Sequence, residues 1–222
     1  MTVRKTYLYK RLVLDLIYPN RCPFCDNYIP YDEYYCVDCR DSLSPPPEHD
    51  DYKEIDYFTS VTEYNKYSIP LINEIKNESN GYALSAAAFM IFQSILTAKL
   101  LRAIDVVTYV PMRRKDKLRR GYNQTAIIAR ELAQLVGKPC VALLKKVRDT
   151  SQQKTLSADE RRKNVKDAFE YKGSLSLSGK TVLIVDDVCT TGSTLCEAAS
   201  KLKEAGADKV IASVFAKTGK IS

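Results

Sequence analysis

The chain has 222 residues, 45% hydrophobic and 27% charged, which excludes a disordered or fibrous protein and allows one substantial core with a small accessory module. Its net charge of +7 is unevenly distributed, because residues 1–60 hold 7 Lys and Arg against 11 Asp and Glu, whereas the remainder holds 27 against 16. The basic excess after residue 60 indicates a polyanionic ligand, either the phosphates of a small molecule or a nucleic-acid backbone.

The N-terminal stretch is predicted to form a short docking helix over residues 7–17, because its apolar residues recur at helical spacing with charged residues between them. No small-residue cleavage site follows, so a secretory signal is not expected. The most apolar run, residues 85–98, is shorter than the roughly 20 residues that a membrane span needs. We therefore expect a cytoplasmic protein with no membrane span.

Two CxxC pairs, Cys22 with Cys25 and Cys36 with Cys39, are separated by ten residues. Each pair can place two thiolates on one metal ion at about 2.3 Å, and two pairs complete a tetrahedral site. Because the protein fills all four positions, the spacing predicts a structural Zn²⁺ site rather than a catalytic one. Surface disulfides and a rubredoxin-like iron site are the alternatives. Four tyrosines lie near these cysteines in the sequence: Tyr28, Tyr31, Tyr34 and Tyr35. They either stack on nucleic-acid bases or cover the small metal module.

After a proline-rich linker at 44–54, strands and helices are predicted to alternate. Strands are expected at 55–62, 105–110, 141–145, 168–171, 181–185 and 209–216, and helices at 69–76, 83–103, 122–136 and 194–204. This alternation is typical of an α/β protein with a parallel sheet flanked by helices. The polar stretch 149–164 is predicted to be a mobile loop. The expected organisation is a helix and zinc module at 1–43, the linker, and one α/β domain at 55–222.

The most informative segment runs from Thr181 to Thr194, where an apolar strand ends in Asp186 and Asp187 and a hydroxyl-rich loop leads into a helix. Backbone N–H groups of such a loop, together with the helix N-terminus, bind anions such as a phosphate monoester. The two carboxylates can accept hydrogen bonds from ribose hydroxyls or support Mg²⁺. The alternative is an ordinary strand followed by an Asp-rich turn and a capped helix. The loop residues expected to hold phosphate are Thr190, Thr191, Gly192, Ser193 and Thr194.

The stretch 113–120 holds six cations in eight positions, between a predicted strand and a predicted helix. At the carboxyl edge of the sheet these charges face pyrophosphate or follow a nucleic-acid backbone. For contact with nucleic acid the candidates are Arg119 and Arg120, with Tyr122 as a stacking partner. The alternative is a solvated charge run.

The string VLIVDDVCTTGSTL at 182–195 resembles the signature of type I phosphoribosyltransferases. Together with the CxxC pairs, RRGYNQ at 119–124 and scattered positions between 150 and 169, it makes the whole chain resemble the ComF family. That family joins a zinc-binding N-terminal module to a type I phosphoribosyltransferase-like domain. Its members are associated with natural competence, in which they are thought to help process or import single-stranded DNA.

The resemblance implies that 5-phosphoribosyl-1-pyrophosphate binds with Mg²⁺. Asp186 and Asp187 would hold the ribose hydroxyls, the loop 190–194 would hold the 5-phosphate, and Arg113 and Arg114 would lie near the pyrophosphate. Segment 148–164 resembles a loop that closes over the substrate in amidophosphoribosyltransferases and excludes water. Thr190 stands where purine-salvage members often have an acid that works on the base nitrogen, which disfavours a purine acceptor.

The function implied by the resemblance is that of a phosphoribosyltransferase, a kind of glycosyltransferase, with an unknown acceptor and a part in DNA uptake and natural transformation. Single-stranded DNA and competence or DNA-processing proteins are the expected partners. The alternative is a noncatalytic single-stranded DNA-binding protein that uses the pocket to sense the ligand. An intact phosphate loop favours donor binding, whereas the lack of an evident general base favours the noncatalytic alternative.

Overall fold

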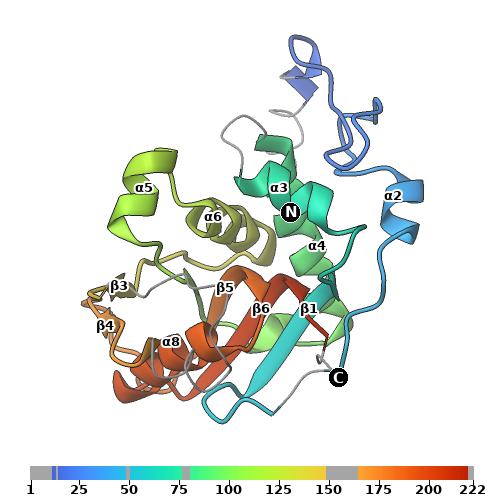
Figure 1. Cartoon of the computed structure of the whole chain (residues 1–222). Coiled ribbons are helices and arrows are strands. Elements are labelled where there is room, and N and C mark those ends of the chain that lie inside the picture. Colours follow the sequence, from blue (N-terminus) through green and yellow to red (C-terminus); the bar gives the residue numbers. More distant parts are fainter. Residues whose placement is uncertain (1–11, 14, 49–50, 77–80, 149–164, 220–222) are drawn as a thin grey trace.

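A computed structural model of the chain describes residues 12–13, 15–48, 51–76, 81–148 and 165–219. Figure 1 shows a central sheet with helices packed on both of its faces. The strands are β1 (Tyr57–Glu63), β2 (Val106–Tyr109), β3 (Leu144–Lys146), β4 (Phe169–Tyr171), β5 (Thr181–Cys189) and β6 (Lys209–Lys217). The helices are α2 (Val37–Asp41), α3 (Ile69–Lys76), α4 (Gly81–Thr97), α5 (Arg114–Arg120), α6 (Gln124–Val136) and α8 (Ser193–Glu204), with a short 3₁₀ helix, η1 (Leu101–Ala103).

The main sheet has the strand order β1-β6-β5-β2, and every neighbouring pair is parallel. Its two central strands, β5 and β6, are almost continuously apolar and buried because helices cover both faces. Neighbouring parallel strands require crossover connections, which the helices between the strands supply. The predicted α/β class with a parallel sheet flanked by helices is confirmed.

Side chains of β5 divide between the two faces of the sheet. Leu183 and Val185 belong to the apolar cluster formed with α3, α4 and α6. Val182 and Ile184 belong to the cluster on the opposite face, which includes α8. Figure 1 shows the same arrangement, with α3, α4 and α6 on one side of the sheet and α8 on the other. This alternation follows from the two-residue period of a strand.

Strands β3 and β4 form a separate antiparallel pair rather than part of the parallel sheet. Leu144 and Phe169 bury this pair in the α8-side cluster. Three-residue strands are too short to show a period, so the sequence predicted the two strands but not their antiparallel pairing. The loop expected at 149–164 lies between them and outside the described residues.

Helix α2 was not predicted, and helices α4 and α5 also differ from the sequence prediction. Helix α4 ends at Thr97 rather than at residue 103, because Lys99 adopts a left-handed conformation with φ of 58° and η1 follows. Helix α5 was not predicted, because its only apolar residue is Leu118, which is 77% exposed, so no apolar spacing announces a helix. Within the described ranges, no helix has the length and apolar character needed to cross a bilayer.

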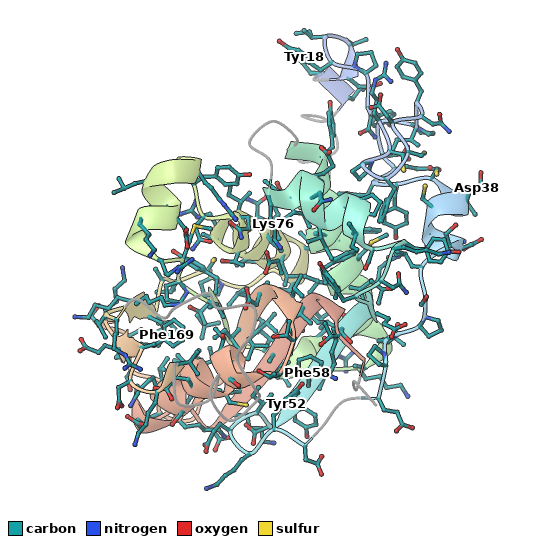
Figure 2. The ribbon with its side chains drawn as sticks, in the orientation of Figure 1. Tyr18, Asp38, Tyr52, Phe58, Lys76 and Phe169 are labelled. Atoms are coloured by element: carbon teal, nitrogen blue, oxygen red, sulfur yellow. The ribbon has the colours of Figure 1, made fainter. Side chains whose placement is uncertain are left out.

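The predicted linker packs against the sheet domain at both of its ends. The Ser44 carbonyl accepts a hydrogen bond from the Thr62 hydroxyl at 2.7 Å. The ring of Tyr52 packs on that of Phe58 with centroids 5.1 Å apart, and Figure 2 shows these two side chains next to each other. The domain boundaries at 43/44 and 54/55 stay predictions.

Candidate functional site

The four cysteines of the CxxC pairs come together, with their Sγ atoms all within 4.8 Å of one another. The Sγ atoms of Cys25 and Cys36 lie 3.8 Å apart. A tetrahedral ion with bonds of about 2.3 Å has sulfur–sulfur edges of about 3.8 Å, so the cluster fits Zn²⁺. All four cysteines are free thiols, which does not support the disulfide alternative. Burial, and hydrogen bonds that the Cys39 thiol makes with Cys36 and Cys25, raise the pKa of Cys39, and a bound cation would favour its thiolate form.

Two of the nearby tyrosines attach the cysteine module to α4. The ring of Tyr34 stacks on that of Phe89, with centroids 4.2 Å apart and an interplanar angle of 5°. The Tyr35 hydroxyl donates a hydrogen bond to Gln93 Oε1. Tyr34 and Tyr35 therefore cover the module rather than present free faces to nucleic-acid bases. Tyr28 is 67% exposed, and the Arg21 guanidinium lies 4.1 Å from its ring centroid.

The acid pair lies at a step in the sheet. Strand β5 pairs with β6 as far as Cys189 but with β2 only as far as Val185. The step leaves Asp186 and Asp187 beside a cavity of about 230 Å³ at the carboxyl edge, where ligands of open α/β sheets bind. The cavity is lined by Lys76, Val110, Pro111, Met112, Arg113, Asp116, Arg120, Asn123, Gln124, Thr125, Lys146, Asp186 and Asp187.

Four cations from separate segments share this cavity with the acids: Lys76 at the end of α3, Arg113 before α5, Arg120 at the end of α5 and Lys146 at the end of β3. Figure 2 labels Lys76, the member of this set that comes from α3. Arg113 is buried and its Nε donates to Asp116 Oδ2 at 2.6 Å, which holds the guanidinium in place. Such a mixture of carboxylates and cations suits a ligand that carries phosphates, hydroxyls and a divalent ion.

The carboxylates of the acid pair are held by backbone and side-chain donors. Asp186 Oδ1 accepts from the Asp187 N–H at 2.9 Å, and Asp187 Oδ1 accepts from the Val188 N–H at 2.8 Å. Gln124 Nε2 donates to Asp187 Oδ2 at 3.2 Å. Burial and the adjacent Asp187 carboxylate raise the pKa of Asp186 well above its usual range. Carboxylate oxygens are the ligands that Mg²⁺ prefers, so Asp186 and Asp187 fit that ion.

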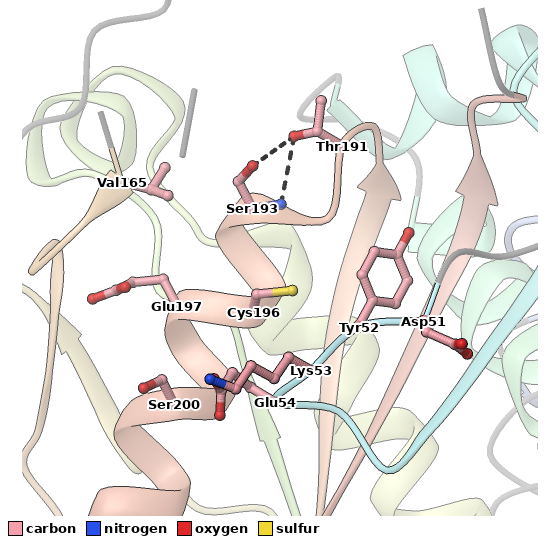
Figure 3. Close-up of a pocket in the computed structure, with 10 residues that line it drawn as sticks. All are labelled: Asp51, Tyr52, Lys53, Glu54, Val165, Thr191, Ser193, Cys196, Glu197 and Ser200. Carbon is pink, nitrogen blue, oxygen red and sulfur yellow. Dashed lines mark hydrogen bonds between the residues drawn. The ribbon is translucent and has the colours of Figure 1, made fainter. Parts of the chain in front are cut away.

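The hydroxyl-rich loop is shaped by Gly192, which has φ of 75° and occupies the N-cap position of α8 without a side-chain cap. Thr191 Oγ1 and Ser193 Oγ lie 2.8 Å apart, and the Ser193 N–H points to Thr191 Oγ1 at 3.5 Å (Figure 3). The first N–H groups of a helix have no acceptor within it, so the start of α8 can bind an anion. Thr190 is exposed, and Thr194 is half-buried in the first turn of α8.

The loop and the acid pair do not line the same cavity. Thr191 and Ser193 border a second, larger hollow of about 420 Å³, which also includes Tyr52 and Lys53 of the linker and the outer side of α8 (Figure 3). The structure thus brings Asp186, Asp187 and Arg113 to one cavity and Thr191 and Ser193 to the other. The side chains of Arg114 and Arg119 lie outside the described part of the chain.

The residues proposed to contact nucleic acid lie in different surroundings. Arg120 lines the acid-pair cavity. Tyr122 packs against the apolar cluster of α4 and α6, and its hydroxyl donates to the Ile75 carbonyl at 3.2 Å. The sequence prediction missed several cavity residues, among them Gln124, Lys76 and Lys146. The motif RRGYNQ contains Gln124 and was the available signal for it, whereas Lys76 and Lys146 carried none.

Comparisons with known proteins found a matching family for the N-terminal module and another for the sheet domain. The phosphoribosyl transferase domain family matches residues 118–220, and the double zinc ribbon domain family matches residues 13–50. Among solved structures, a glutamine phosphoribosylpyrophosphate amidotransferase from B. subtilis, complexed with ADP and GMP, is 23% identical, with a TM-score of 0.41 over 64% of this chain and 30% of that one. The two family matches and the cysteine cluster define a phosphoribosyltransferase-like protein with a zinc-binding N-terminal module.

Relatives in sequence cover most of the chain. DNA utilization protein YhgH of Salmonella typhimurium is 31% identical over 85% of this chain and 80% of its own length. Competence protein F of Haemophilus influenzae is 28% identical over 85% of this chain and 82% of its own. The chain belongs to the ComF family, which includes these two proteins.

Proposed function

We propose that the acid-pair cavity, together with the loop 190–194 that follows the acids in the chain, binds 5-phosphoribosyl-1-pyrophosphate with Mg²⁺, and that the protein is a phosphoribosyltransferase in DNA uptake. The observation that carries the proposal is the position of Asp186 and Asp187 among four cations in one cavity at the sheet edge. The names of its relatives, a DNA utilization protein and a competence protein, support the proposed part in DNA uptake.

Each group of residues has a proposed role in binding the donor. Asp186 and Asp187 accept hydrogen bonds from ribose hydroxyls, and the loop 190–194 with the start of α8 holds the 5-phosphate. Arg113 and Lys146, with Lys76 and Arg120, hold the pyrophosphate. Arg114, whose side chain is not described, stays a candidate for the same role.

The proposed reaction breaks the bond between C1 of the ribose and the pyrophosphate oxygen, and a nucleophilic atom of the acceptor forms a new bond to C1. The electron pair of the broken bond leaves with the pyrophosphate, and the cavity cations stabilise its developing charge. Mg²⁺, when bound, neutralises part of the pyrophosphate charge. The carboxylates of the acid pair orient the sugar ring.

Calorimetric titration with the donor, with and without Mg²⁺, tests the proposal. We expect Mg²⁺-dependent binding that the double variant Asp186→Asn with Asp187→Asn abolishes, because its side chains no longer carry the negative charge that holds the ion and the hydroxyls. The control is Asp208→Asn, an exposed carboxylate after α8. Undiminished affinity in the double variant contradicts the assignment. Release of pyrophosphate, assayed with single-stranded DNA present, then tests turnover.

Single-stranded DNA binding is the second candidate function. It is favoured by the exposed lysines Lys115 and Lys117 on α5, whose terminal residue Arg120 lines the cavity. In this alternative function the cavity senses 5-phosphoribosyl-1-pyrophosphate and α5 contacts DNA, with no transfer reaction. Donor binding without pyrophosphate release, together with DNA affinity that changes when the donor is bound, supports the noncatalytic function.

A further inference from the structure

Gln124 is the first residue of α6 and carries a buried polar atom without a partner. Its side chain is 7% exposed and lines the acid-pair cavity. Across the described part of the chain, only two buried side-chain atoms lack a hydrogen-bond partner, Gln124 Oε1 and Asn20 Oδ1. Asn20 lies in the cysteine module, so Gln124 Oε1 is the one that borders a ligand cavity.

The orientation of the Gln124 amide follows from its neighbour. An ionised carboxylate can only accept hydrogen bonds, so the NH₂ group must face Asp187, as the 3.2 Å contact between Nε2 and Oδ2 shows. The carbonyl oxygen Oε1 is then turned away from Asp187. Because Asn123 is the N-cap of α6 and its side chain accepts from the Thr125 N–H, the backbone that carries Gln124 is fixed.

Buried acceptors in proteins are normally paired with a donor. An unpaired acceptor in a cavity wall therefore indicates that the ligand brings the donor. Besides its phosphates, a ribose phosphate offers hydroxyl groups, each with one O–H to donate. The acid pair already faces the same cavity, so a sugar ring held there lies within the space that Gln124 borders.

We propose that Gln124 is a specificity-determining residue that accepts, through Oε1, a hydrogen bond from a ring hydroxyl of the bound ribose phosphate while its NH₂ group holds Asp187. This inference rests on the proposed function, because it requires a ribose phosphate in the cavity. A water molecule held by Mg²⁺ offers the same O–H donor, so the test separates the two sources. The consequence is that Gln124 helps the site to distinguish ribose from deoxyribose phosphates.

The test uses ribose 5-phosphate with its 2-deoxy and 3-deoxy analogues, and the full chain as wild type, Gln124→Met and Gln134→Met. Methionine keeps the length of the side chain but removes the acceptor and the donor. Gln134 is an exposed glutamine on the same helix and serves as the matched control. Affinities are measured by calorimetry with and without Mg²⁺, and unfolding by urea shows whether each variant is folded.

We expect the wild type and Gln134→Met to prefer ribose 5-phosphate over one of the deoxy analogues by about tenfold or more, since the analogue leaves buried acceptors unpaired. In Gln124→Met that preference should fall by about threefold or more, because one acceptor is gone. The analogue comparison on the wild type remains informative even if Gln124→Met is poorly folded, because an absent preference overturns the proposal.

The outcomes separate this inference from the proposed function. If wild type binds neither the donor nor ribose 5-phosphate, the proposed function and this inference both fail. If the donor binds but the sugar preference is the same in Gln124→Met and Gln134→Met, only the role of Gln124 is overturned. If Gln124→Met weakens the binding of all three sugar phosphates equally, and only with Mg²⁺, then a metal-bound water donates the hydrogen bond to Oε1. That outcome overturns the hydroxyl assignment.

Discussion

The ring of Tyr52 lies directly against Gly192, so that a Cβ atom at the glycine would be 2.2 Å from Tyr52 Cε1. The Tyr52 hydroxyl also lies 3.5 Å from Cys189 Sγ, at the end of β5. A residue of the linker thus packs on the loop proposed to bind phosphate. Two independent conditions, the positive φ and the contact with Tyr52, require glycine at position 192.

Gly192→Ala is expected to destabilise the protein by about 1–3 kcal/mol and to weaken binding of sugar phosphates, because alanine is strained at positive φ and collides with Tyr52. Adding Tyr52→Ala should recover part of that loss, since it removes the collision but not the strain. Urea denaturation of both single variants and the double variant gives the coupling free energy between positions 52 and 192. Strictly additive effects would show that the contact with Tyr52 does not constrain position 192.

Purified protein should contain one zinc ion per chain, and Cys22→Ser combined with Cys25→Ser should lose it. The physical reason is that two of the four thiolate ligands are removed from a site with no spare position. Elemental analysis measures the metal, and Cys140→Ser, outside the cluster, is the control that should retain it. The parallel sheet should stay folded, with disorder centred on the module. A double variant with full zinc content would refute the Cys₄ site.

Asp186→Asn should raise the free energy of unfolding at neutral pH. Since the folded-state pKa of Asp186 is raised, its favourable contribution is complete below the unfolded pKa of about 3.9 and is lost as pH rises through the folded pKa. Asparagine mimics the neutral form of Asp186. The increase in the free energy of unfolding should therefore be largest above the folded-state pKa and vanish toward about pH 4. Urea titrations across this range check the profile, with Asp208→Asn as control. A gain that does not change with pH would argue against the raised pKa.

Binding of single-stranded DNA, if it uses α5, should weaken with salt and with loss of the cations of that helix. Each phosphate contact contributes about −0.7 to the slope of log affinity against log salt, so Lys117→Ala with Arg119→Ala should flatten the slope by about 1.4. Arg120→Ala is a poorer choice, because that residue also lines the acid-pair cavity. Fluorescence anisotropy at several salt concentrations measures the slope. An unchanged slope would place DNA contact elsewhere.

The strand, loop and helix around Asp186 could be predicted because hydrophobic pattern and turn chemistry agree along one continuous segment. The buried strand 209–216 followed from its mostly apolar run, which only Ser213 interrupts, for the same reason. The contact between Gln124 and Asp187 could not, since it joins residues 63 positions apart and depends on how α6 packs beside β5. Helix α5 was missed because its polar, charged sequence has no apolar face to reveal it.

The stack of Tyr34 on Phe89 has a thermodynamic consequence that reaches beyond the cysteine cluster. Tyr34 belongs to the same apolar cluster as residues of α4 and as Phe215 at the centre of the sheet. A ligand that binds only the folded form stabilises everything that folds together with its site. Zinc bound at the cluster therefore adds to the stability of α4 through the Tyr34 contact, and a chelator should lower the melting temperature of the chain even though the sheet stays folded at room temperature.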